Sequence, residues 1–382
     1  MIVTGAKKSK TMGAKKNKTT VAFVVNGGRE SAMGHRARAL SARLRGRYRV
    51  RVAYREGNRA AALFRFFAFL RRTRPRAAYV FDMAYSGVLA AWAYRTLTGV
   101  PFVVETGDAI YELMRSTGNR GPFGLWLTRR FEQLSLRAAD RIVVRGQAHR
   151  QGLAAQGVSA EVIQDGVDTR AFAPQSSNGL RKEFSLEGVL TVGLVGSTVW
   201  SEKLGMCYGW ELVELLRLLA SAPVKGVVIG GGTGLPRLKA RCREYGIENR
   251  VLFLGHVPFA QLPRYLNLID VCLSTQTNDT VGQVRTTGKL PLYLAAGRYV
   301  LASDVGEASR VLAQEMLVPY EGVKDEQYPR RLASRIEAIL ARPELLARGA
   351  DGVAVAKKYF DYSLLAERVG ALIDAVLASH KS

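Results

Sequence analysis

The sequence predicts an α/β protein made of two Rossmann-like domains, each built on a doubly wound parallel sheet. Three observations lead to this prediction. The chain has 382 residues, which is more than one hydrophobic core usually holds. Short, continuous apolar runs, typical of strands that are buried on both faces, alternate with helical patterns. Some of these runs end in glycines, as at Gly27-Gly28 and at 230–232, where a parallel strand can turn into a helix.

The first domain is predicted over residues 20–175. Its strands are expected at 20–26, 49–54, 78–81, 101–105, 141–144 and 160–163, and its helices at 33–44, 60–72, 87–97, 122–137 and 147–156. Gly27 and Gly28 separate the first strand from the first helix, where free backbone N–H groups can face a phosphate. These two glycines are therefore candidate phosphate-binding residues.

A linker is predicted over 176–186 and a second domain over 187–350. Strands are expected at 190–195, 225–229, 251–254, 271–274 and 300–302, and helices at 210–219, 235–245, 261–267, 287–296 and 307–313. A helical region is expected over the last residues, 351–382. The alternation again favours a parallel sheet with helices on both faces.

Charge is distributed unevenly along the chain. Residues 1–19, predicted to be a disordered basic tail, contain six lysines. Residues 1–175 hold 31 Lys and Arg against 11 Asp and Glu, whereas residues 176–382 hold 25 against 21. This asymmetry indicates an anionic partner for the first half. Zinc spacings, RNP motifs and helix-turn-helix signatures are absent from the sequence, so an anionic membrane is favoured over nucleic acid; an arginine-rich composition without a partner is the alternative.

Membrane contact would be peripheral. The sequence has no apolar run of 18 residues and no signal-peptide pattern. Its three scattered cysteines fit a reducing compartment, so we expect a cytoplasmic protein, peripheral on the inner face of the membrane. The aromatic, arginine-flanked segment 60–74 could lie on an anionic leaflet. Its apolar residues nearly encircle it, however, which favours a buried helix that covers the sheet.

One segment carries a family resemblance. Residues 162–174, V-I-Q-D-G-V-D-T-R-A-F-A-P, resemble the interdomain segment of the large glycogen-synthase-like family of retaining glycosyltransferases, the group 1 or family 4 type. The resemblance implies the GT-B fold, in which two Rossmann-like domains face a central cleft and a closing helix crosses back to the first domain. It also implies a nucleoside-diphosphate sugar as donor.

The resemblance assigns most donor-side residues. Segment 193–205 resembles the strand and loop that meet the donor diphosphate: Lys203 matches the family's lysine, and either Ser197 or Thr198 stands at the place of its arginine. Segment 227–257 is characteristic of the family, and its end, His256-Val257, resembles the place where backbone atoms hold the nucleotide base. Gly231 is a further candidate there, although a plain strand-to-helix turn explains each of the glycines 230–232 equally well.

The sequence departs from the family at two carboxylates. Many members carry Glu-x7-Glu, facing the sugar and the ribose, but the aligned positions here are Val284 and Leu292. What remains is Arg285-Thr286-Thr287-Gly288-Lys289 at a helix start, whose two cations, hydroxyls and N–H groups form a candidate diphosphate cradle. Thr287 could also be the N-cap of that helix.

On the acceptor side, the segment 105–108 ends a strand, where open α/β sheets place their sites. The resemblance puts a His or Asp near the reacting sugar, so Asp108 is the first candidate catalytic residue and Glu105 the second. Asp108 could instead cap a helix over 109–115. His35 could face it across the cleft, whereas His149 is expected on a surface helix without a specific role.

These assignments imply a hexosyltransferase of cell-envelope polysaccharide or glycolipid biosynthesis. The resemblance implies transfer without metal or cofactor and with retention, to a glycan or lipid-linked acceptor, and the sequence has no Asp-x-Asp motif. Two alternatives stay open. A catalytically inactive scaffold or partner subunit is favoured by the missing carboxylates, and a nucleotide-sugar epimerase would share the fold.

Overall fold

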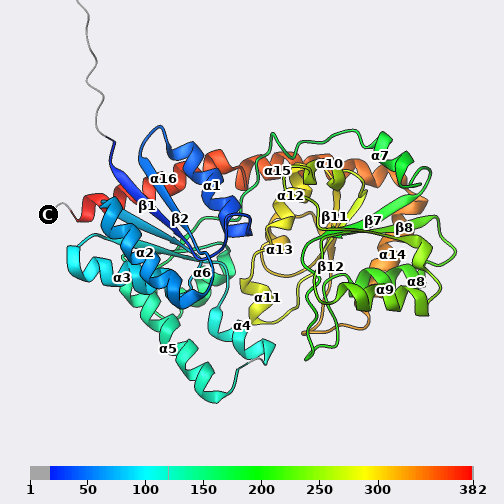
Figure 1. Cartoon of the computed structure of the whole chain (residues 1–382). Coiled ribbons are helices and arrows are strands. Elements are labelled where there is room, and N and C mark those ends of the chain that lie inside the picture. The colour runs from blue at the N-terminus through cyan, green and yellow to red at the C-terminus, as the bar shows by residue number, and fades with distance from the viewer. Residues whose placement is uncertain (1–17, 119, 381–382) are drawn as a thin grey trace, which may run out of the picture.

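The computed structural model describes residues 18–118 and 120–380 and contains two six-stranded parallel sheets, side by side along the chain (Figure 1). The α/β class and the two doubly wound sheets predicted from the sequence are confirmed. Most of the predicted basic tail, residues 1–17, lies outside the described residues. Within the described residues, no helix combines the length and the apolar character needed to cross a membrane.

The first sheet has its helices in two layers. Its strands are β1 (Thr20–Val25), β2 (Arg49–Tyr54), β3 (Ala77–Phe81), β4 (Phe102–Thr106), β5 (Arg141–Val144) and β6 (Glu161–Val162), in the order β2-β1-β3-β4-β5-β6. Because side chains alternate along a strand, Phe23 faces α1 (Ala32–Leu44) and α16 (Tyr362–Ser379). Its neighbour Val24 faces α2 (Arg59–Thr73) and α3 (Tyr85–Thr98).

The helix α2 is the aromatic, arginine-flanked segment of the sequence. Ala62, Phe66 and Leu70 recur at helical spacing and are buried against the sheet, so the interpretation as a sheet-covering helix is confirmed. Phe64 points the other way and is 73% exposed. The remaining helices of this half are α4 (Ile110–Thr117), α5 (Pro122–Ala138) and α6 (Gln147–Ala154).

The second sheet repeats the plan. Its strands are β7 (Leu190–Val195), β8 (Val224–Ile229), β9 (Val251–Gly255), β10 (Val271–Ser274), β11 (Tyr299–Ser303) and β12 (Leu317–Val318), in the order β12-β11-β10-β7-β8-β9. One face packs against α8 (Trp210–Leu218), α9 (Leu235–Glu244) and α14 (Tyr328–Ala341). The other packs against α7 (Asn178–Glu183), α10 (Leu262–Leu266), α12 (Lys289–Ala295) and α15 (Asp351–Tyr359).

The chain passes between the two halves twice, and the two passages pair with each other. Val167 donates its N–H to the Phe360 carbonyl at 2.9 Å and accepts from the Tyr362 N–H at 3.1 Å. A Cβ on Gly166 would lie 2.3 Å from the Tyr362 ring, so a side chain there would displace the ring. The D-G-V-D-T motif of the sequence therefore forms one side of the interdomain junction.

Three local predictions differ from the structure. The predicted linker 176–186 contains α7, because Leu180 and Leu186 are buried in the core of the second half. The strand β12 and the helix α14 were not predicted; they lie between the helix expected at 307–313 and the helical region expected at 351–382. The closing region is two helices: α15 packs on α12, and only α16 packs on α1 of the first half.

Candidate active site

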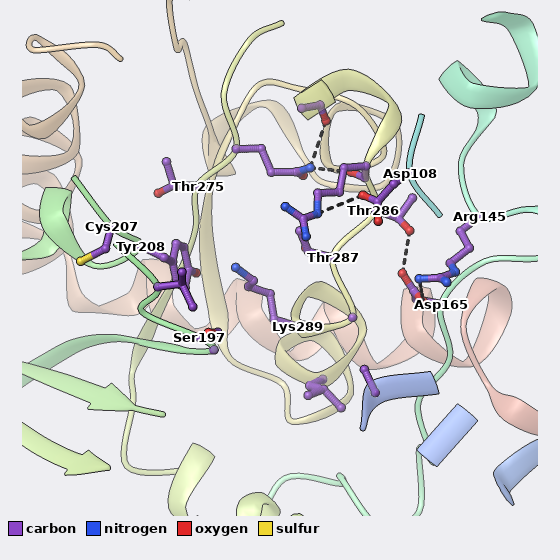
Figure 2. A pocket seen from close by; sticks show the side chains of 18 of the residues that line it. Asp108, Arg145, Asp165, Ser197, Cys207, Tyr208, Thr275, Thr286, Thr287 and Lys289 are labelled. Carbon is purple, nitrogen blue, oxygen red and sulfur yellow. Dashed lines mark hydrogen bonds and ion pairs between the residues drawn. The ribbon is translucent and has the colours of Figure 1, made fainter. Parts of the chain in front are cut away.

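A cleft of about 950 Å³ lies between the two halves and is lined by residues of both. The first half contributes the start of α1 and the segments that follow β4, β5 and β6; the second contributes the loops after β7, β9, β10 and β12 and the start of α12. This is the carboxyl edge of both sheets, where open α/β sheets bind their ligands. Figure 2 shows Lys289 in the middle, between Tyr208 on one side and Asp165 on the other.

The second half contributes one lysine and one arginine to the cleft lining, Lys289 and Arg285, and Lys289 is the more buried of the two. Lys289 begins α12, and its Nζ lies 3.3 Å from the centroid of the Tyr208 ring. An aromatic face attracts a cation without neutralising it. Although part of the residue's surface stays exposed, burial of the ammonium, together with the nearby Arg285, lowers the pKa of Lys289 to about 7. The group is therefore poised to gain stability from an anion.

Two contacts cross the cleft just before α12. The Arg285 guanidinium lies 3.2 Å from Asp108 Oδ1, and the Thr286 hydroxyl donates to Asp165 Oδ2 at 2.6 Å. Gln276 supports this loop by donating to the Arg285 carbonyl. Both cross-cleft contacts are drawn in Figure 2. They hold the predicted diphosphate cradle against the predicted acceptor-side carboxylate.

A buried ionic network supports the first-half wall of the cleft. Glu105 is fully buried and pairs with Arg36 Nε at 2.8 Å and Arg145 Nε at 3.1 Å. The Tyr79 hydroxyl donates to its other oxygen at 2.7 Å. Arg145 in turn reaches Asp165 at 3.6 Å. Three partners on one carboxylate satisfy charges that would be costly to bury alone, and they orient Arg145 toward the cleft.

The structure brings nine of the fourteen sequence-predicted site residues to the cleft. These are Asp108, Ser197, His256, Val257, Arg285, Thr286, Thr287, Lys289 and Leu292. Glu105, Gly27, Gly28, Lys203 and Gly231 do not line it. Glu105 instead holds Arg145, and the two N-terminal glycines stand one turn before the cleft-lining start of α1. Lys203 is exposed and extends toward Gly118 of the first half, whose added Cβ would lie 3.7 Å from its Cδ.

Three simpler interpretations of these residues are not what the structure shows. Asp108 does not cap α4. The N-cap residue of this helix is Ala109, and the first N–H groups of the helix donate to the Glu132 carboxylate. The N-cap of α12 is Gly288, and no side chain caps it, so Thr287 is not a side-chain cap. His149 is not a surface residue: it is 4% exposed, and burial lowers its pKa to about 4.

Several cleft residues were missed in the sequence. Arg145 directly follows β5 and carried a usable signal, because it stands at the carboxyl end of a parallel strand. A Cβ on Gly107 would lie 2.6 Å from its guanidinium carbon, so the glycine of the 105–108 segment makes room for it. Tyr208 and Glu211 carried no signal, since they reach the cleft from a long irregular loop and the first turn of α8.

The missing Glu-x7-Glu carboxylates are replaced by packing. Val284 is 7% and Leu292 is 9% exposed, and both are part of the apolar interior of the second half. Both positions are therefore occupied by apolar side chains instead of carboxylates. If a ligand with hydroxyl groups binds here, other cleft residues have to recognise them.

Comparison with known families and proteins agrees with this architecture. Residues 18–165 match the model of the Glycosyl transferase 4-like domain, and residues 190–342 match that of Glycosyl transferases group 1. Together the two models cover most of the chain. The 2-deoxystreptamine glucosyltransferase of Streptomyces kanamyceticus is 30% identical over 233 residues, which are 57% of this chain and 57% of that protein.

Solved structures share the fold at low identity. Sucrose-phosphate synthase from Thermosynechococcus elongatus aligns with a TM-score of 0.74 at 17% identity, over 95% of this chain and 100% of that one. HepE of Anabaena, solved in complex with UDP and glucose, aligns with a TM-score of 0.73 at 15% identity, over 94% and 100%.

Proposed function

Because this chain belongs to the group 1 glycosyltransferases with the GT-B fold, we propose that it moves a hexose from a nucleoside-diphosphate sugar to a glycan or lipid-linked acceptor. Transfer would need no metal or other cofactor and would retain the anomeric configuration. The observation that carries the proposal is the cleft itself, in which Lys289 and Arg285 of one half face Asp108 of the other. The complex of HepE with UDP and glucose supports a donor of this class.

The donor diphosphate would bind at the start of α12. Lys289 and Arg285 supply positive charge, Thr286 and Thr287 supply hydroxyls, and Ser197 faces them from the loop after β7. Negative charge grows on the diphosphate as it leaves, so fixed cations there stabilise the transition state more than the ground state. Arg285 would exchange its contact with Asp108 for the diphosphate when the donor enters.

The base would lie near His256 and Val257, at the β9 end of the sheet, with Leu292 below the ribose. On the opposite wall, Asp108 would accept a hydrogen bond from the incoming hydroxyl or from the donor sugar. In a same-face attack, the new glycosidic bond forms as the bond to the diphosphate breaks. The leaving diphosphate oxygen then takes the acceptor proton, so no protein nucleophile is required.

Binding and transfer experiments test the proposal. Calorimetry with UDP, GDP, ADP and dTDP should find saturable binding of one nucleotide, and Lys289→Ala should weaken it at least about tenfold, the scale of one charge-assisted contact. Transfer to candidate acceptors should fall in parallel. Lys203→Ala is the comparison, since this lysine is exposed outside the cleft. If Lys203→Ala loses as much affinity as Lys289→Ala, Lys203 contacts the diphosphate in the complex. If the affinity of Lys203→Ala is unchanged, Lys203 is not part of the site.

Two results would favour the alternatives. If no nucleotide or nucleotide sugar binds, the scaffold interpretation, to which the missing Glu-x7-Glu carboxylates point, replaces catalysis. If a nucleotide sugar binds and is converted to its epimer without any acceptor, the protein is an epimerase.

We also propose that the first half contacts an anionic membrane from the cytoplasmic side. Three large apolar residues on one face of α5 are exposed: Phe123 by 74%, Trp126 by 53% and Leu127 by 52%. Arg130 lies over the Trp126 ring. An exposed aromatic face beside arginines suits the boundary between lipid headgroups and acyl chains. Such contact would bring the cleft to a lipid-linked acceptor.

A further inference from the structure

The carboxylate of Glu211 is the feature of the cleft that the proposed donor contacts leave unused. Glu211 lies in the first turn of α8, after the loop that follows β7. The residue is 6% exposed and lines the cleft. It is therefore a nearly buried acid in the lining of the candidate ligand site.

The other carboxylates of the cleft are engaged. Glu30 pairs with Arg38 at 2.7 Å, and Asp108 with Arg285 at 3.2 Å. Asp165 pairs with Arg145 and accepts from Thr286. In the described part of the chain, the Glu211 side chain has no ion pair and no hydrogen bond with another residue. Its own backbone N–H donates to the carboxylate, which offsets only part of the cost of burying the charge, and burial raises the pKa of Glu211 to about 7.

The groups around Glu211 indicate which part of a ligand it meets. Lys289 interacts with it electrostatically but is too far away for an ion pair, which leaves a gap between ammonium and carboxylate. Tyr320, which follows β12, interacts electrostatically with Glu211, and Thr275, which follows β10, also lines the cleft. The base candidates follow β9, at the opposite edge of the sheet. In Figure 2, Tyr208 and Thr275 lie together on one side of Lys289.

We propose that Glu211 binds hydroxyl groups of the transferred hexose and is a specificity-determining residue of the donor site. This inference rests on the proposed function. A hydroxyl in the gap can donate to the carboxylate and accept from Lys289, and the Thr275 and Tyr320 hydroxyls complete a polar recess. A carboxylate suits neighbouring hydroxyls because its two oxygens can accept from both. Glu211 would thus do from α8 what the family's sugar-facing carboxylate, missing here at Val284, would have done.

The test compares a nucleotide with its sugar. Glu211→Gln keeps the shape and removes the charge, so it should weaken binding of the nucleotide sugar about tenfold or more and leave binding of the bare nucleoside diphosphate unchanged. Glu214→Gln, on the same helix but outside the cleft and bonded to Arg241, should change neither affinity. If Glu211 acts only through Lys289, both affinities fall together in Glu211→Gln, and the proposal is overturned.

Deoxy donors locate the contact. Nucleotide sugars that lack one ring hydroxyl at a time should lose affinity for the wild-type protein at the contacted position, and Glu211→Ala should remove that difference. Equal discrimination by wild type and variant would refute the assignment.

Thermal unfolding distinguishes a binding role from a structural one. Removing a buried charge that has no partner in another residue should not lower stability, so a large loss of stability in Glu211→Gln would contradict the proposal. Absence of any nucleotide binding to wild type would instead contradict the proposed function.

Discussion

Lys289 shows how one residue combines burial with charge. Its ammonium rests on the Tyr208 ring instead of a carboxylate, and Glu211, the acid that interacts with it electrostatically, is beyond ion-pair distance. The attraction of an aromatic face offsets only part of the desolvation cost. The lysine is therefore available to an incoming anion, because no protein carboxylate is paired with it and competes for the ammonium group.

The pH dependence of donor binding follows from this lysine. Burial lowers the pKa of Lys289 to about 7, so the ammonium form that binds a diphosphate is lost as pH rises through this value. Affinity for a bare nucleoside diphosphate, which Glu211 is expected to leave unchanged, should fall by up to about tenfold per pH unit from about pH 7 to pH 9, with proton uptake on binding. Calorimetry in two buffers of different ionisation enthalpy measures both.

A matched variant provides the control. Lys289→Arg keeps a cation that stays protonated over this range, so its affinity should change little with pH even if its absolute affinity differs. A flat profile without proton uptake in the wild-type protein would mean that Lys289 is fully charged before the ligand arrives.

At the scale of elements, α16 ties the end of the chain to the first half. Asp361 caps this helix and accepts from Thr169 of the other interdomain passage. Leu365 is fully buried among residues of β1, β3 and α1, and its methyl lies beside Gly166. A helix that follows the second half thus completes the core of the first.

Stability of the first half should therefore depend on α16. Leu365→Ala should lower the free energy of unfolding by about 2–5 kcal/mol, because it removes buried methyl groups and leaves a cavity. Chemical denaturation followed by intrinsic fluorescence measures the change. Glu367→Ala, on the exposed face of the same helix, should cost less than about 0.5 kcal/mol. Similar small losses in both variants would show that α16 is not part of the core.

At the scale of the whole molecule, charge and exposed aromatics coincide in the first half. Residues 1–175 carry a net charge of +20, against +4 for the remainder. The exposed Phe123 and Trp126 stack on each other on α5. Neither residue belongs to any of the described hydrophobic clusters. An anionic surface would meet the basic half first.

Vesicle flotation tests the membrane proposal. The protein should float with vesicles that contain anionic lipid and not with neutral ones, and added salt should reduce recovery because surface charges are screened. Trp126→Ser should lower recovery severalfold, because it removes an exposed aromatic side chain that would insert into the leaflet. Leu218→Ser, an exposed apolar residue of the second half, should have no effect. Equal recovery of the protein with both vesicle types, with or without residues 1–19, would contradict the membrane proposal.

Local patterns in the sequence were sufficient for the architecture. Apolar runs and glycine turns report each strand and helix through their immediate neighbours, and so both sheets could be predicted along with most of their elements. The D-G-V-D-T segment located the junction, because its glycine and hydrogen-bonding residues are needed wherever the two passages pair. Among the elements that were missed, α7, α11 (Thr280–Val284) and β12 are too short to carry a periodic signal, whereas α14 is long enough and lies in a stretch to which we assigned no element.

The content of the cleft required the folded chain. Asp108, Arg285 and Lys289 could be named from motifs at strand ends and a helix start, but Glu105 and Lys203 share the same local signals and lie outside the lining. Whether a charged side chain faces ligand, core or solvent depends on residues far away in the sequence, such as the Arg36 and Arg145 that enclose Glu105. Glu211 became visible as a candidate only through the absence of such partners around it, which is a property of the fold and not of any segment.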